Sequence, residues 1–171
     1  MRNLEKYSIP PEALETARIL ECWTWMLGTN PGTPVAWSLF GDPFLAAPDG
    51  RIQRLDILQG HMVDVAKTRA EFQLRAELDA GRIGWFQGPL VDQMIAQGVL
   101  RGVGQIYGFR KLPMRGGSMT WDNVELTNPL NYHKAVSQIH QQAQDFPTEM
   151  RVNSLHLGGS RKVRKWWQLW K

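Results

Sequence analysis

The histidines are the first residues in this sequence that could do chemistry, because an imidazole can bind a metal ion or move a proton near neutral pH. His133 and His140 are seven residues apart in a segment with helical periodicity, so they share one face of the expected helix. At a rise of ~1.5 Å per residue, their rings are roughly 10 Å apart along the axis, too far to ligate one ion. We therefore predict that both histidines flank a hydrophobic stripe and that the chain holds no metal.

Glycine-rich segments could hold a phosphate group if their spacing matched a nucleotide-binding loop. In Gly102-Val103-Gly104-Gln105-Ile106-Tyr107-Gly108, the third glycine comes one residue later than the dinucleotide fingerprint requires. A strand is also expected to follow, whereas the fingerprint opens a helix. We predict tight turns here and at Gly116-Gly117, and no nucleotide or other cofactor.

Carboxylates and the single thiol complete the groups that could react. Four aspartates recur beside short strands, but their spacing lacks the alternating oxygens and final glutamate of an EF-hand loop. They form either an acidic face for a basic partner or separate solvated charges. Cys22 is the only cysteine, and its apolar context predicts a buried structural thiol. No local signature of a nucleophile is present, although the members of a Ser-His-Asp or Cys-His arrangement need only be near one another in space. The four aspartates are Asp42, Asp49, Asp56 and Asp64.

The elements that must position these side chains begin with a meander of short strands. The turn residues Pro48-Asp49-Gly50 and Gln59-Gly60 separate short apolar runs. Such runs between turn signals indicate antiparallel strands. The runs lie at 35–39, 44–45, 52–57 and 62–65, and two further strands are expected at 103–109 and 124–126.

Capping and breaking residues place helices around this meander. Thr68 and Glu71 form a capping box that opens a helix ending at Gly81. Proline is tolerated in the first turn of a helix, so further helices are expected to begin near residues 10, 89 and 129. Residues 1–9 are expected to be a flexible lead. The last helix is predicted to bury a stripe of Tyr132, Ala135, Val136, Ile139 and Ala143.

Length and composition bound the fold class. A chain of 171 residues favours one domain, and an apolar fraction of 43% suits an ordinary globular protein. No apolar run is long enough for a transmembrane helix, and the first residues lack the apolar region of a secretory signal, so we expect a cytoplasmic protein. The order of elements predicts a single α+β domain, in which a small antiparallel β-meander sheet packs against several α-helices.

The last residues of the chain differ from the rest in charge. Five of the 20 basic residues lie in residues 159–171, which contain no acid but hold three tryptophans. Residues 1–158 then carry 15 basic and 16 acidic side chains, which argues against a nucleic-acid-binding surface on the body. We predict a single α+β domain at 1–158 and a basic, Trp-rich tail at 159–171. Three roles fit the tail: it packs on the body, it binds nucleic acid or an anionic membrane, or it is incidental.

Short motifs occur along the chain between residues 10 and 152. They are Phe40-Gly41-Asp42, Asp49-Gly50-Arg51, Leu55-Asp56, Gln105-Ile106-Tyr107-Gly108-Phe109, Gly116-Gly117, Asp122-Asn123-Val124-Glu125 and Gln138-Ile139-His140-Gln141-Gln142. In these motifs the chain resembles the C-terminal domain of bacterial immunity proteins that protect against type VI secretion DNase toxins. That domain often follows a GAD-like domain, which is not recognised in this sequence.

The resemblance implies an antitoxin-like protein that binds a cognate nuclease toxin and shuts or distorts its active site. It implies no catalysis, no cofactor and no small-molecule substrate. Aromatic and arginine side chains often anchor such interfaces, and acids would oppose basic groups on a DNA-cleaving toxin. The alternative function is a nucleic-acid- or membrane-surface-binding module that acts through the tail. The expected partner contacts are Asp42, Asp49, Arg115, Gly116, Gly117, Trp121, Asp122 and Glu125.

Overall fold

Five short strands form one antiparallel sheet in the order β1-β2-β3-β4-β5, so each strand pairs with the next strand along the chain. The structure is a computed structural model that describes residues 4–145, and the predicted tail at 159–171 lies outside them. Gly50, at a φ of 86°, makes the turn between β3 and β4 as its residue type predicts. The strands are β1 (Ser8–Ile9), β2 (Thr33–Ser38), β3 (Pro43–Ala46), β4 (Ile52–Asp56) and β5 (His61–Ala66).

A second, two-stranded sheet consists of β6 (Ile106–Phe109) and β7 (Val124–Thr127). The backbone N–H of Tyr107 donates to the carbonyl of Leu39 at 2.8 Å, which ties this small sheet to the end of β2. The strand predicted at 103–109 is shorter than expected, because Gly104 has a φ of 70° and turns the chain just before it.

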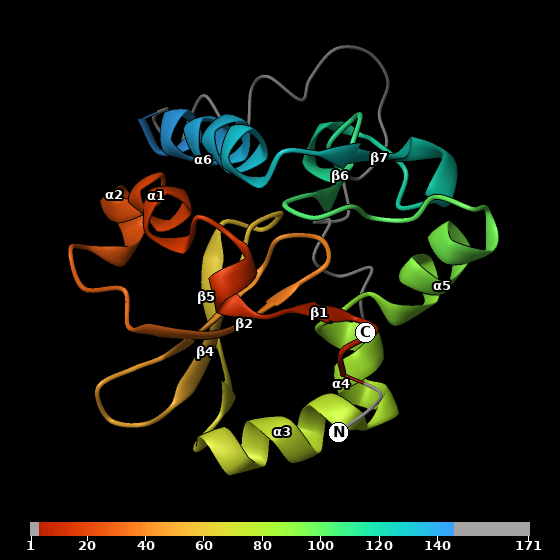
Figure 1. The fold of residues 1–171 in the computed structure, drawn as a ribbon. Helices are drawn as coiled ribbons and strands as arrows, with labels where there is room; N and C mark the ends of the chain where they lie inside the picture. Colours follow the sequence, from red (N-terminus) through yellow and green to blue (C-terminus); the bar gives the residue numbers. More distant parts are fainter. Residues whose placement is uncertain (1–3, 146–171) are drawn as a thin grey trace, which may run out of the picture.

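Helices lie on both sides of the five-stranded sheet (Figure 1). α6 lies beside α1 and α2 on one side, α3 and α4 lie on the other, and α5 lies at one end. The predicted α+β class, a small antiparallel meander packed against several helices, is confirmed. The helices are η1 (Pro11–Ala13), α1 (Thr16–Glu21), α2 (Thr24–Leu27), α3 (Arg69–Glu77), α4 (Asp79–Gly84), α5 (Gly88–Ala96), η2 (Pro113–Arg115), η3 (Trp121–Asn123) and α6 (Pro129–Asp145).

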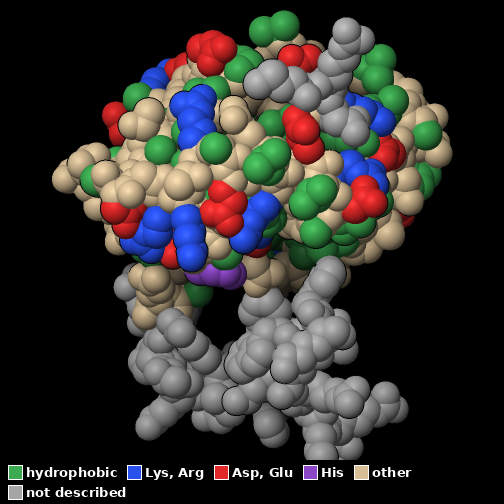
Figure 2. Space-filling view, turned by 90° about the horizontal axis from the view of Figure 1, so that it is seen from below, with side chains coloured by type: hydrophobic (Ala, Val, Ile, Leu, Met, Phe, Trp, Pro, Cys, Tyr) green, Lys and Arg blue, Asp and Glu red, His purple; other side chains and the backbone are tan. Residues whose placement is uncertain are grey.

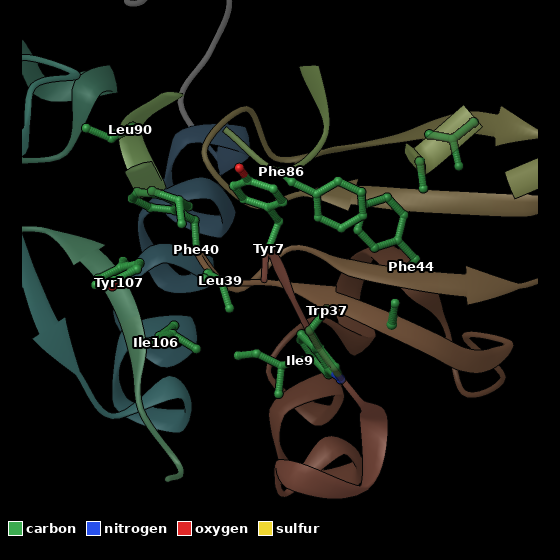
Figure 3. Packing of buried hydrophobic residues seen from close by; sticks show 14 of the residues in the cluster. Tyr7, Ile9, Trp37, Leu39, Phe40, Phe44, Phe86, Leu90, Ile106 and Tyr107 are labelled. Carbon is green, nitrogen blue, oxygen red and sulfur yellow. The ribbon is translucent and has the colours of Figure 1, made fainter. Parts of the chain in front are cut away.

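Buried apolar side chains form a large cluster and a small one, and the small one consists of Trp23, Leu55, Ile57 and Val136. On the α3 side, the ring of Phe44 lies 5.0 Å from those of both Phe72 and Phe86, measured between centroids. Figure 3 shows the continuation of the large cluster, where Phe40 lies against Tyr107 of the small sheet. The core therefore joins the two sheets and α5 into one unit.

The N-terminal segment corrects a prediction, because the described part of residues 1–9 is not a flexible lead. Ser8 and Ile9 pair with β2, and Ile9 is fully buried. The hydroxyl of Tyr7 donates to a carboxylate oxygen of Asp92 at 2.9 Å, and Lys6 forms an ion pair with the same carboxylate. Apolar burial and a long-range ion pair order a segment whose local sequence carries no strand signal.

The first predicted helix is interrupted in the structure, which gives η1, α1 and α2 instead of one element. The indole N–H of Trp23 donates to Nδ1 of His133 at 2.9 Å, and that of Trp25 donates to the hydroxyl of Ser137 at 2.7 Å. Residues two apart point to opposite sides of a continuous helix. Trp23 and Trp25 could therefore not both reach α6 if they lay in one unbroken helix. The break at Trp23 brings both onto α6.

The helix predicted to end at Gly81 instead ends at Glu77, where Leu78 adopts an extended conformation. Gly81 lies inside the next helix, α4. A Cβ atom at this position would lie 2.2 Å from the carbonyl oxygen of Arg75, so the glycine allows α4 to pack tightly on α3. Glycine at position 81 predicts a helix end, whereas in the structure Gly81 allows α3 and α4 to approach each other closely.

The buried face of α6 differs from the predicted stripe. Val136 is buried as expected, but Ala135 and Ala143 are exposed. His133 and Ser137 are buried in their place, because they accept the hydrogen bonds from the two indoles of α2 and its cap. Polar partners from a distant segment, rather than apolar spacing alone, set the orientation of this helix.

Candidate interaction site

The loop between β6 and β7, residues 110–123, is held in one conformation by the side-chain amide of Asn123. Its Oδ1 accepts from the backbone N–H of Lys111 at 3.0 Å, and its Nδ2 donates to the carbonyls of Lys111 at 2.8 Å and Ser118 at 2.7 Å. The backbone N–H of Arg110 also donates to the carbonyl of Asn123 at 2.9 Å. The side-chain amide of Asn123 thus connects the two ends of the loop to each other and to Ser118 between them.

The glycine pair at the centre of this loop has two separate roles. Gly116 ends η2 with a left-handed φ of 81°, a conformation that glycine adopts without strain. A Cβ atom on Gly117 would lie 1.8 Å from the carbonyl oxygen of Lys111, so only glycine fits there. Together they form the tight turn that the sequence predicted, and they leave the side chain of Arg115 exposed at its edge.

Exposed apolar side chains are concentrated in the part of the chain that contains this loop. Six of the nine large hydrophobic residues that are exposed in the described chain fall between residues 95 and 121. η3 packs against α5, and Figure 1 shows the segment that joins α5 to β6 at the same end of the molecule as the β6–β7 loop. We call this surface the β6–β7 face; its apolar members are Ile95, Leu100, Val103, Met114, Met119 and Trp121.

The β6–β7 face is basic, whereas the rest of the described chain is acidic. Residues 93–123 carry four cations and one acid, and residues 4–92 and 124–145 together carry nine cations and fourteen acids. On the side of the molecule where α3 and α4 lie, positively and negatively charged side chains are mixed with small apolar patches, as Figure 2 shows. The cations of the β6–β7 face are Arg101, Arg110, Lys111 and Arg115, and its acid is Asp122.

Six of the eight predicted contact residues are brought together by the structure. Arg115, Gly116, Gly117, Trp121 and Asp122 belong to the loop, and Glu125 follows it in β7. Trp121 is 43% exposed, which leaves its indole ready to contact another molecule. The carboxylate of Glu125 lies 3.6 Å from the guanidinium of Arg110, so part of its charge is balanced within the chain.

Asp49 lies away from these six residues, in the turn between β3 and β4. Its carboxylate accepts from Nε of Arg51 at 2.6 Å, and these hydrogen bonds lower the pKa of Asp49. Nη1 of Arg51 lies 2.6 Å from a carboxylate oxygen of Asp64. The turn therefore holds a local charge network on the exposed surface, separate from the β6–β7 face.

Asp42 corrects a prediction, because its side chain is buried and cannot contact a partner. It is 2% exposed, and its carboxylate accepts from the backbone N–H of Ile57 at 3.1 Å. Arg54 lies 3.7 Å from the other carboxylate oxygen. Burial raises the pKa of Asp42 to about 7, against the opposing effect of Arg54. The residue links the β2–β3 turn to the end of β4 and belongs to the scaffold.

The two histidines of α6 serve as packing and hydrogen-bonding groups. His133 is fully buried, and its Nδ1 accepts from Trp23, so the ring is neutral with its proton on Nε2. Nε2 of His140 lies 2.9 Å from the carbonyl of Ile57. Within residues 4–145, no group of three or more His, Cys, Asp or Glu side chains is placed to hold a metal ion. Cys22 is partly exposed rather than buried, with its sulfur near the carbonyl of Arg18.

Comparison with known proteins places the loop inside a recognised segment. Residues 66–140 match the family model of T6SS immunity protein Tdi1, C-terminal. This match confirms, over those residues, the resemblance predicted from the sequence. The immunity-family segment starts at the end of β5 and runs into α6, so it contains the whole β6–β7 face. The family is one of type VI secretion immunity proteins.

Among the solved structures that are similar to this chain is one titled "Crystal structure of Atu4351 from Agrobacterium tumefaciens". It is 17% identical, with a TM-score of 0.48, over 71% of this chain and 63% of that chain. No curated protein matches the sequence. Among the described residues, no helix has both the length and the apolar character needed to cross a membrane.

Replacing Gly117 with alanine tests whether the loop of the immunity-family segment is held as tightly as its contacts indicate. The new methyl group would overlap the carbonyl of Lys111, so we expect a loss of about 1–3 kcal/mol in the free energy of unfolding. Gly84→Ala is the matched control, because no atom lies within 4 Å of a Cβ at that helical position. Urea unfolding measures both variants, and equal stabilities would contradict the tight packing at Gly117.

Proposed function

We propose that this chain is an immunity protein that binds a cognate type VI secretion nuclease effector in the cytoplasm and stops its activity. The β6–β7 face, an exposed apolar and basic surface inside the immunity-family segment, is the observation that carries the proposal. The protein would act by binding alone, with no catalytic residue, cofactor or small-molecule substrate. Its partner is a protein whose active site it covers or distorts.

Two properties of the face support a role in protein binding. An exposed apolar patch rimmed by polar groups is typical of an interaction site, and tryptophan, methionine and arginine are enriched in such interfaces. The loop is also held by Asn123 and by the turn at Gly116-Gly117, so binding orders few additional groups. A preorganised surface loses less conformational entropy on association, which favours affinity.

Co-expression with the product of the adjacent reading frame tests the proposal. In a bacterial host, that product alone is expected to degrade plasmid DNA and stop growth, and this chain is expected to restore both. A stable complex should be recovered by affinity purification. A version lacking residues 159–171 should protect equally well, because the proposed contacts lie in the body. Protection that depends on the tail would instead favour the nucleic-acid- or membrane-binding alternative.

Trp121 is expected to be an anchor of the complex. Truncating a central interface tryptophan commonly costs at least 2 kcal/mol, so Trp121→Ala should weaken effector binding by about thirtyfold or more. Leu74→Ala is the matched control, because Leu74 is more exposed, at 70%, but lies on α3 outside the face. Calorimetry or biolayer interferometry measures both. A loss of affinity in Leu74→Ala with normal binding by Trp121→Ala would move the interface to the α3–α4 side.

A further inference from the structure

We propose that the β6–β7 face docks onto an acidic protein surface, a patch of carboxylates around an apolar hollow on the nuclease effector. This inference rests on the proposed function and adds the chemistry of the partner. It also reverses the sequence-based expectation, in which acids of this chain oppose basic groups of the toxin.

The first step of the argument is that the face has cations with no partner inside the described chain. Within residues 4–145, neither Arg115 nor Lys111 takes part in an ion pair, and both are exposed. Arg101 differs, because its guanidinium donates to the carbonyls of Gly102 and Gln105. Arg110 is likewise used within the chain, by its pair with Glu125. The two remaining cations flank the tight turn at the exposed edge of the loop.

The second step is that three of the four acids predicted to contact the toxin lie beside an arginine of this chain. Asp49 pairs with Arg51 at 2.6 Å, and Asp42 is buried beside Arg54. Glu125 lies 3.6 Å from Arg110, which leaves Asp122 as the one acid of the face. An interface works through charges that are not already balanced, so the sign presented to a partner here is positive.

The third step separates an acidic protein from a nucleic acid as the partner. Nucleic-acid surfaces bring many cations to the phosphate backbone, whereas this face has four, one of which is paired with Glu125. The remainder of the described chain carries fourteen acids against nine cations and would repel a long polyanion. The same face exposes the apolar side chains of Val103, Met114, Met119 and Trp121. Such flexible and aromatic groups suit an apolar hollow on a protein.

Charge reversal at Arg115 tests the inference. Arg115→Glu should weaken binding of the adjacent-frame effector by about tenfold or more, mainly by slowing association, because like charges then meet at the interface. Arg69→Glu is the matched control, since Arg69 is an exposed arginine at the start of α3, outside the face. Its affinity should stay within about twofold of the wild type. Raising the salt concentration should weaken wild-type binding more steeply than binding by Arg115→Glu.

The possible outcomes distinguish a failure of this inference from a failure of the proposed function. If the wild type binds and protects but Arg115→Glu behaves like Arg69→Glu, the acidic partner surface is wrong while the immunity function stands. If the wild type neither binds nor protects, the proposed function itself is wrong. A fluorescent single-stranded oligonucleotide serves as a competing probe: binding that requires Arg115 would overturn the inference in favour of nucleic acid. Lys111→Glu provides an independent second reversal if Arg115→Glu lowers the melting temperature.

Discussion

Replacing Arg54 with methionine is expected to lower the free energy of unfolding by about 3 kcal/mol, because it removes the cation that lies beside two largely buried carboxylates. Arg54 is 11% exposed, pairs with Asp56 at 2.8 Å and lies 3.7 Å from Asp42. Its guanidinium also donates to the carbonyl of Gly84 at 3.1 Å, and so connects β4 to the end of α4. Methionine fills similar volume but leaves two carboxylates facing each other.

Arg51→Met is the matched control for this prediction. Arg51 also bridges two aspartates, Asp49 and Asp64, but its side chain is 46% exposed. Water and salt screen exposed ion pairs, so this variant should be nearly as stable as the wild type. Urea unfolding followed by tryptophan fluorescence measures both. Equal losses in the two variants would show that burial does not set the contribution of these networks.

The parts of the fold that local sequence determines were predicted well. Turn chemistry at Pro48-Asp49-Gly50 placed the β3–β4 turn, since Gly50 has the positive φ that such a turn needs. The side chain of Thr68 accepts from the backbone N–H of Glu71 and opens α3, as the capping box predicted. The carboxylate of Glu71 returns to the N–H of Lys67, one residue earlier than in the standard box.

The parts that depend on contacts between distant residues were not predictable from local pattern. Trp23 breaks its helix to reach His133, which is 110 residues away in sequence. Gly81 allows two helices to approach, a role that its residue type shares with a helix end. Burial of Asp42 likewise depends on Arg54 and Ile57 in another strand. Local sequence fixes turns and caps, whereas helix orientation and the exposure of charged groups depend on packing.

The candidate site also has features that local sequence predicts and features that depend on packing between distant residues. The glycine pair belongs to the motifs that carry the resemblance, whereas Trp121 is predicted as a contact from its residue type, because aromatic side chains often anchor interfaces. Asn123 was not identified as a structural residue, although its amide makes three hydrogen bonds that close the loop. An asparagine in a loop beside a glycine pair is a weak signal, because many loops contain one. Its role becomes visible only when Lys111 and Ser118 are placed next to it.

The pH dependence of stability is expected to change in opposite directions when Asp42 and His133 are replaced. Burial lowers the pKa of His133 to about 3, so between about pH 3 and 6.5 the unfolded chain binds a proton that the folded chain does not. This contribution to stability is lost as the pH falls. A second proton on the ring would also place two N–H groups opposite each other, since Nδ1 accepts from Trp23. Burial raises the pKa of Asp42 to about 7, so its contribution grows as the pH falls from about 7 to 4.

The two contributions oppose each other in the wild type, and each variant removes one of them. Relative to the wild type, Asp42→Asn should lose up to about 1.4 kcal/mol per pH unit on acidification between about pH 6.5 and 4.5. His133→Asn keeps an acceptor for Trp23. On acidification over the same range, its free energy of unfolding should rise relative to that of the wild type, whatever its stability at neutral pH. Urea unfolding at several pH values measures the slopes. Parallel slopes in all three proteins would contradict the buried, neutral state of His133, because a charged or solvated imidazole would not couple folding to proton release.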